Sequence, residues 1–215
     1  MSHIIYSEKS MRKIISSIVV LCAILFSANA AAETRYGVVA GADITDLSFK
    51  QDLIAIEQSV GYMAGVTSEV MFPGIGFGID LGLQYTQRGA TLNLGEQEIW
   101  ASDGYSKERS YLHYIEIPLH LKFKYTNLAG FEDYVAPFVF GGPSMSILIA
   151  HNKIEALEYA GAEFGLTAGI GAELFRNWQL SGSYTWGVTY ALKTVKLQDF
   201  SAQNRTWKIA VTYFF

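Results

Sequence analysis

The chain has 215 residues, of which 50% are hydrophobic and 17% are charged, and its formal net charge is -4. This mildly acidic balance excludes the basic footprint of a nucleic-acid-binding protein. Beyond residue 32, no apolar run approaches the roughly 20 residues that a membrane-spanning helix needs, so the hydrophobic residues must follow another pattern.

Residues 1–32 have the composition of an N-terminal extension followed by a cleavable signal peptide. A basic start at 11–13 precedes an apolar core at 14–26, and small residues follow, so that cleavage after Ala30 or Ala32 fits. The only cysteine, Cys22, lies in this segment. We therefore expect a mature chain of 33–215 without thiols or disulfides, stabilised by its sheet alone.

Residues 111–125, YLHYIEIPLHLKFKY, show the clearest periodicity in the chain. Their odd-numbered positions are apolar apart from His113, whereas their even-numbered positions include the charged or polar Glu116, His120, Lys122 and Lys124. Because side chains on a strand alternate between its faces, this pattern predicts one apolar and one charged face. A tilted strand of this length spans about 30 Å, enough to cross a bilayer. An amphipathic strand of a soluble sandwich is the alternative.

The same alternation recurs and predicts eight strands in all. They are expected at 36–49, 60–72, 77–94, 111–125, 134–149, 163–175, 178–189 and 205–215. The strand at 134–149 is apolar on both faces, so its orientation stays open. An even number of strands lets the last pair with the first and removes the sheet edges. We therefore predict an all-β fold, a closed eight-stranded antiparallel transmembrane β-barrel over residues 33–215.

Short and long connections alternate between the expected strands. The short ones are 73–76, 126–133 and 176–177, and the long polar ones are 50–59, 95–110, 151–162 and 191–204. Short periplasmic turns and long extracellular loops are typical of bacterial outer-membrane barrels. The pattern thus predicts an outer-membrane location with both termini in the periplasm. Residues 53–58 and 154–159 are candidates for helical turns.

Several charged side chains fall on the polar face of their strands. They are Asp80, Arg88, Glu116, His120, Lys122, Glu173 and Lys208. Because an eight-stranded barrel has room only for side chains inside, we expect these groups to pair with one another and fill the lumen. A proton or ion path through them is the alternative.

The last strand ends in a pattern of its own. Val211, Tyr213 and Phe215 share one face, and Phe215 is the final residue. This arrangement resembles the C-terminal signal by which the barrel assembly machinery recognises outer-membrane barrels during insertion. A lipid-facing strand that ends in an interfacial aromatic residue also accounts for it.

Two motifs resemble those of a known family. QYTQRG at 84–89 and YIEIPL at 114–119 are similar to the QYxxRG and YLEIPLLLK patterns of the PorT-like outer-membrane β-barrel proteins of Bacteroidota, which are Gram-negative. Residues 137–144, 168–171 and 204–215 match in the same order, so the resemblance covers about 36–215. It implies an eight-stranded outer-membrane barrel. Most members have no assigned activity; the namesake is tied to protein secretion, for which no motif is identifiable in this chain.

Metal and enzyme chemistry find little support in the sequence. His113 and His120 lie on opposite faces of one strand, so they cannot bind one metal ion, and His151 belongs to a loop. No GxSxG nucleophile motif is present. We expect neither a cofactor nor an enzymatic activity, although some small outer-membrane barrels are enzymes.

Two classes of function stay open. The first is a structural barrel with a filled lumen, whose extracellular loops bind a partner or ligand; Trp100 and Tyr105 in the longest loop favour it slightly. The second is an accessory of an envelope transport or secretion system. Expected partners are outer-membrane lipid, the assembly machinery and an envelope protein, but not nucleic acid. The activity, the oligomeric state, the start codon (Met1 or Met11) and the cleavage site remain open.

Overall fold

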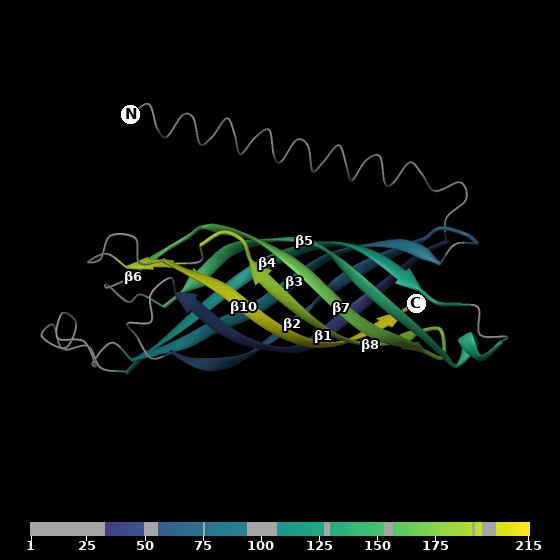
Figure 1. The fold of residues 1–215 in the computed structure, drawn as a ribbon, viewed down its shortest axis with the longest axis horizontal. Coiled ribbons are helices and arrows are strands. Elements are labelled where there is room, and N and C mark those ends of the chain that lie inside the picture. The colour runs from purple at the N-terminus through teal and green to yellow at the C-terminus, as the bar shows by residue number, and fades with distance from the viewer. Residues whose placement is uncertain are drawn as a thin grey trace, which may run out of the picture.

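The computed structural model describes residues 33–49, 56–74, 76–93, 107–126, 130–152, 157–190, 192–194 and 201–215, and nearly all of these lie in strands (Figure 1). The predicted extension and signal peptide at 1–32 lie outside the described residues, as do Trp100 and Tyr105. The long strands are β1 (Glu33–Phe49), β2 (Ile56–Met71), β3 (Phe77–Asn93), β4 (Lys107–Lys124), β5 (Val135–His151), β7 (Ala162–Leu174), β8 (Trp178–Gly187) and β10 (Ser201–Phe214).

These strands form a closed antiparallel barrel, which confirms the predicted fold. They pair in the order β1-β2-β3-β4-β5-β7-β8-β10. β10 also pairs with β1, from Gly37 opposite Phe214 to Phe49 opposite Ala202. Closure leaves no long strand of the described barrel with a free edge. In the described ranges, no helix is both long and apolar enough to span a membrane.

The structure contains two short strands that the alternation of residues does not predict. β6 (Leu157–Tyr159) pairs with β9 (Leu192–Thr194), and β9 pairs with the first residues of β10. The helical turn expected at 154–159 is therefore wrong for 157–159, and the turn expected at 53–58 is wrong for 56–58, which begin β2. Pairing with a neighbouring strand outweighs a weak local preference for helix.

The two ends of the barrel differ. Glu33 and Phe215 lie at the same end as the short connections, one of which contains the 3-10 helix η2 (Phe131–Asp133). We call this the terminal end. The opposite end, where β6 and β9 lie, is the loop end (Figure 1).

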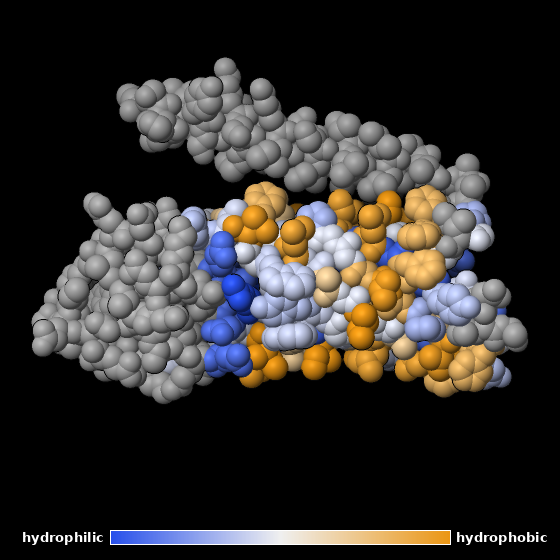
Figure 2. All heavy atoms as spheres, viewed as in Figure 1, coloured by the Kyte–Doolittle hydropathy of each residue, from blue (hydrophilic) through white to orange (hydrophobic). Residues whose placement is uncertain are grey.

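Apolar side chains cover much of the outer wall (Figure 2), and aromatic residues lie on this wall at two levels. Phe77 and Trp178 face outward near the terminal end, and Tyr85 and Trp186 lie eight positions further along the same strands. Eight residues of a tilted strand rise roughly 20 Å, close to the apolar height of transmembrane barrels. Leu121, 68% exposed, lies on β4 within this apolar wall.

The orientation of β5 is settled by the structure. Phe138 is buried inside the barrel, and its ring packs against Gly171, while the Phe140 ring packs against Gly169. A methyl group added at either glycine would overlap the facing ring. The glycines of β7 therefore make room for two aromatic rings that narrow the lumen.

Candidate functional site in the barrel interior

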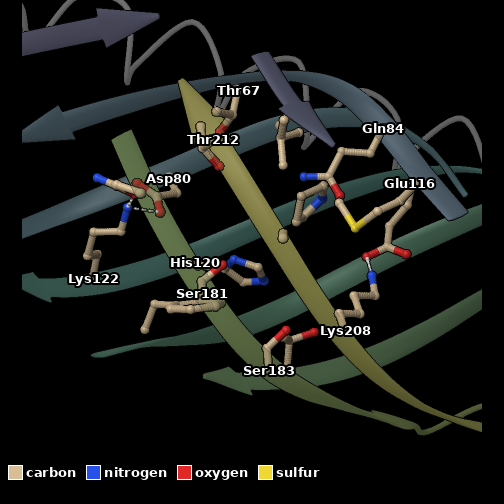
Figure 3. A pocket seen from close by; sticks show the side chains of 18 of the residues that line it. Thr67, Asp80, Gln84, Glu116, His120, Lys122, Ser181, Ser183, Lys208 and Thr212 are labelled. Carbon is tan, nitrogen blue, oxygen red and sulfur yellow. Dashed lines mark hydrogen bonds and ion pairs between the residues drawn. The ribbon is translucent and has the colours of Figure 1, made fainter. Parts of the chain in front are cut away.

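All seven of the charged or polar side chains assigned to the lumen lie on the inner face of the barrel. Five are buried, namely Arg88, Glu116, Lys122, Glu173 and Lys208, and the other two, Asp80 and His120, line an internal cavity. They do not form one network. They divide between two clusters of ion pairs, and His120 lies between them (Figure 3).

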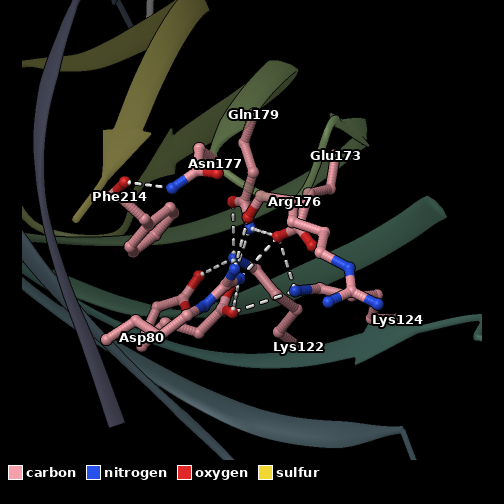
Figure 4. A network of polar contacts seen from close by, with 10 residues as sticks. Asp80, Lys122, Lys124, Glu173, Arg176, Asn177, Gln179 and Phe214 are labelled. Carbon is pink, nitrogen blue, oxygen red and sulfur yellow. Dashed lines mark hydrogen bonds and ion pairs between the residues drawn. The ribbon is translucent and has the colours of Figure 1, made fainter. Parts of the chain in front are cut away.

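The terminal-end cluster consists of Arg35, Glu69, Asp80, Lys122, Lys124, Glu173 and Gln179 (Figure 4). Glu69, which is 0% exposed, is its centre. Glu69 Oε2 accepts hydrogen bonds from Lys122 Nζ at 2.7 Å and Gln179 Nε2 at 2.8 Å. Its Oε1 accepts from Lys124 Nζ at 3.0 Å and from Arg35. Three cations face three carboxylates, so the cluster is formally neutral.

Further contacts hold these cations in place. Glu173 Oε2 accepts from Lys124 Nζ at 2.7 Å and from Arg35 at 2.5 Å. Lys122 Nζ also binds Asp80 Oδ2 at 2.7 Å and lies 4.6 Å from the centre of the Phe138 ring. Burying a charged side chain costs free energy unless it is paired and hydrogen-bonded, as the side chains of this cluster are.

The loop-end cluster consists of Asp43, Thr86, Arg88, Glu116, Glu163, Asn204 and Lys208. Arg88 bridges two carboxylates, Glu116 and Glu163, the latter at 2.6 Å. Lys208 Nζ binds the other oxygen of Glu116 at 2.5 Å. Asn204 Nδ2 donates to Glu163 at 2.8 Å.

The two family-like motifs meet in this cluster. Arg88 belongs to QYTQRG and Glu116 to YIEIPL, and the two side chains form an ion pair. Thr86 of the first motif donates to Asp43. Tyr114 of the second is fully buried, with its ring centre 5.5 Å from the Arg88 guanidinium. The motifs thus build the ion pairs that fill the loop end of the lumen.

A cavity of about 80 Å³ separates the clusters, and we call it the chamber. Asp80 and Lys122 line it on one side, and Glu116 and Lys208 on the other, with His120 between them (Figure 3). The His120 ring packs on Phe140 at 5.2 Å between centres. A second, larger cavity of about 540 Å³ opens at the terminal end, where Arg35, Lys124 and Glu173 line it.

Five charged members of the clusters are absent from the sequence-based set: Arg35, Asp43, Glu69, Lys124 and Glu163. Four of them share the parity of other inward residues of their strands, so alternation alone could have found them. Arg35 precedes the expected start of β1 at residue 36, and no periodic signal covers it.

The described histidines outside the chamber have structural contacts. His113 faces outward, and its Nδ1 lies 2.6 Å from the Tyr85 hydroxyl oxygen. The His151 ring stacks on Tyr159 at 4.1 Å. Within the described residues, no group of three His, Cys, Asp or Glu side chains could hold a metal ion.

The C-terminal residues face the lipid. Val211 and Phe215 are exposed on the outer wall, Phe215 by 74%, and the Tyr213 ring lies 4.8 Å from Trp178 and 5.6 Å from Phe215. The Phe215 backbone N–H donates to the Tyr36 carbonyl at 2.9 Å, which extends the β1–β10 seam to the last residue.

Comparison with protein families identifies the fold as a known type. The model of the outer membrane protein β-barrel domain matches residues 26–192, most of the chain. The chain belongs to this family. This membership locates the protein in the outer membrane, as predicted. None of the curated proteins matches it in sequence.

Solved outer-membrane barrels align with most of this chain, and OprG shares its fold. OprG of Pseudomonas aeruginosa is 10% identical, with a TM-score of 0.54 over 86% of this chain and 97% of that one. Outer membrane protein W of E. coli is 12% identical, with a TM-score of 0.44 over 87% and 100%. Neisserial surface protein A is also 12% identical, with a TM-score of 0.45 over 84% and 97%. In bacterial outer-membrane barrels the short turns face the periplasm. The terminal end, which carries the short connections, is therefore the periplasmic end.

Proposed function

We propose that this outer-membrane β-barrel protein is a sealed membrane scaffold that presents its extracellular loops to a partner or ligand and does not act as a pore or an enzyme. The observation that carries the proposal is the lumen, which ion pairs fill at both ends. An eight-stranded barrel has an interior just wide enough for side chains, whereas the aqueous channels of porins appear with about sixteen strands.

Strand pairing at the loop end supports the role of the loops. β6 lies in the connection between β5 and β7, and β9 lies in the connection between β8 and β10. Their pairing joins these two connections, and β9 joins them to β10. A binding surface built on such paired strands loses less conformational entropy on binding than separate loops would.

The sealed lumen predicts that the purified monomer does not conduct potassium or chloride ions in a planar bilayer. Opening a water-filled path would require the ion pairs of Arg88 and Lys122 to separate, leaving buried charges without partners. Current steps in potassium chloride should not exceed those of protein-free membranes, while a sixteen-stranded porin in the same apparatus should give stable steps. Reproducible open channels from the monomer would contradict the proposal.

The proposed partner is an envelope protein or surface component, to be identified by affinity purification from native outer membrane. A variant with residues 95–105 replaced by a short glycine-serine linker is the matched control, since it should leave the barrel closed. Proteins recovered with the full chain and lost with this variant would be loop partners. If the full chain and the variant recover the same proteins, a part of the protein other than this loop binds the partner.

An accessory role in envelope transport or protein secretion is the second candidate function. The resemblance of the two motifs to PorT-like proteins of Bacteroidota favours it. The Arg88–Glu116 ion pair gives these motifs a structural role in the barrel. The motifs are therefore weaker support for a role in secretion. Secretion genes beside the coding gene would favour the accessory role, and loss of secretion on deletion of the gene would establish it.

We also propose that Val211, Tyr213 and Phe215 form the signal read by the assembly machinery. Deletion of Phe215 should lower the amount of barrel in the outer membrane and leave unassembled or degraded protein. Leu180→Ala, an outward substitution on β8, controls for a general loss of lipid-facing area. Fractionation with heat-modifiable gel mobility measures the folded amount. Wild-type levels of the Phe215 deletion would refute the signal.

A further inference from the structure

A series of carboxylates runs along the lumen, and a shared donor bridges most consecutive members. Glu173 lines the cavity at the terminal end, and it shares Lys124 with Glu69. Glu69 in turn shares Lys122 with Asp80, which lines the chamber. The distances from the lysine nitrogen atoms to these oxygens lie between 2.7 and 3.0 Å.

The series continues on the other side of the chamber. Glu116 lines the chamber and shares Arg88 with Glu163, which accepts from Asn204 toward the loop end. The shared guanidinium holds the two carboxylates side by side. The series is therefore interrupted between Asp80 and Glu116, where the chamber lies (Figure 3).

About half of the chamber lining is polar, and it includes buried polar atoms that lack a partner among the described residues. Asp80 and His120 lie directly opposite each other in the β3–β4 register. Asp80 Oδ1 and His120 Nε2 are both buried and have no hydrogen-bond partner among the described residues. The hydroxyl-bearing residues Ser181, Ser183 and Thr212 also line the chamber. Its volume of about 80 Å³ has room for more than one water molecule.

Polar cavities of this size hold ordered water, whereas dry cavities are apolar. We propose that water in the chamber, together with His120, joins the two halves of the carboxylate series into a path that carries protons, but no larger ions, along the lumen. The activity goes beyond the sealed scaffold proposed above and is compatible with it, since a proton moves between hydrogen-bonded groups without the ion pairs separating.

Each step of the path moves one proton and returns the groups to their starting charge. A chamber water receives a proton from the Asp80 side and releases another toward Glu116. His120 accepts a proton at one ring nitrogen and releases one from the other. A lysine gives a proton to one carboxylate and takes one from the next. Arg88 keeps its own protons, so Glu116 passes its proton to Glu163, the carboxylate that the same guanidinium holds beside it, and Glu163 releases a proton toward the loop end. Bulk water at each end supplies and removes the proton.

The surroundings of His120 are balanced in charge. The charged groups that line the chamber with it are Asp80 of β3, Glu116 and Lys122 of its own strand and Lys208 of β10. The other strands contribute uncharged side chains, among them Val39, Met63, Phe140, Thr167 and Ser181. A proton in transit therefore meets two carboxylates as well as two ammonium groups.

The test is a pH step across vesicles that contain the folded protein, a trapped pH dye and valinomycin with potassium to compensate charge. We expect proton flux above that of protein-free vesicles. His120→Phe, which removes the relay group and fills part of the chamber, should slow this flux about tenfold or more, since a positioned proton-transfer group contributes at least that much. Thr212→Val should also slow it, by removing a lining hydroxyl at nearly constant volume.

His113→Phe is the matched control, because it changes a histidine of the same strand that faces outward. Its flux should equal that of the wild type. Heat-modifiable mobility shows which variants are folded, and Thr212→Val keeps the test decisive if His120→Phe does not fold. Wild-type flux equal to that of protein-free vesicles, or folded chamber variants that match the wild type, would overturn the proposal. Potassium flux into the same vesicles prepared without valinomycin would instead refute the sealed scaffold.

Discussion

Glu69→Leu is expected to destabilise the barrel by about 3–5 kcal/mol, the usual cost of leaving buried charges without their partner. The Glu69 carboxylate is fully buried and accepts from Arg35, Lys122 and Lys124. Without it, three cations would share only Asp80 and Glu173. Urea-induced unfolding in lipid vesicles measures the change in free energy.

Asp133→Leu is the control for Glu69→Leu. It removes the carboxylate partner of Arg176, but this ion pair lies in the exposed turns of the terminal end. The Asp133 carboxylate raises the pKa of Arg176 through a hydrogen bond and its charge, yet water screens a pair this exposed, so it contributes little to stability. Equal losses from the two variants would show that the lumen cluster is not a buried network.

Leu121→Arg is expected to cost about 1–3 kcal/mol, because it places a guanidinium against hydrocarbon between the middle of the bilayer and the aromatic level of the terminal end. Leu121 is 68% exposed on the apolar outer wall, and its neighbours on the strand, His120 and Lys122, face inward. The free energy of folding into vesicles measures the loss. Tyr125→Arg, at the terminal end of the same face, should cost only about 0–1 kcal/mol. If the two variants behave alike, Leu121 does not lie in the membrane.

Alternation alone predicts much of this architecture. In residues 111–125 it places Glu116 and Lys122 on one face and Leu121 on the other, and in the structure these faces are the lumen and the outer wall. The argument works because one face must meet hydrocarbon and the other must not. It fails in β5, where the inward Phe138 and Phe140 are as apolar as the outward residues.

The alternation of residues also does not predict where a side chain lies along the barrel axis relative to side chains of other strands. The separation of Lys122 from Glu116 into different clusters depends on the register between strands, which sets Asp80 opposite His120 and Gln84 opposite Glu116. Pairing partners such as Glu69 on β2 and Lys122 on β4 come from strands that are not adjacent, so their contact depends on how the sheet curves into the closed barrel. The three-residue strands β6 and β9 are too short to show any period.

The ion pairs of the lumen have a consequence for the way the barrel is assembled. Arg35 and Glu173 are 138 positions apart in the chain, and Glu69 and Gln179 are 110 apart. Neither contact can form while the sheet is still open. Contacts between residues so far apart in the sequence therefore stabilise the protein only late in folding. Until then these side chains need water, and a half-inserted sheet would expose them to hydrocarbon at high cost. Closure of the β1–β10 seam and entry into the membrane should therefore be one concerted event, with few stable intermediates for proteases to capture.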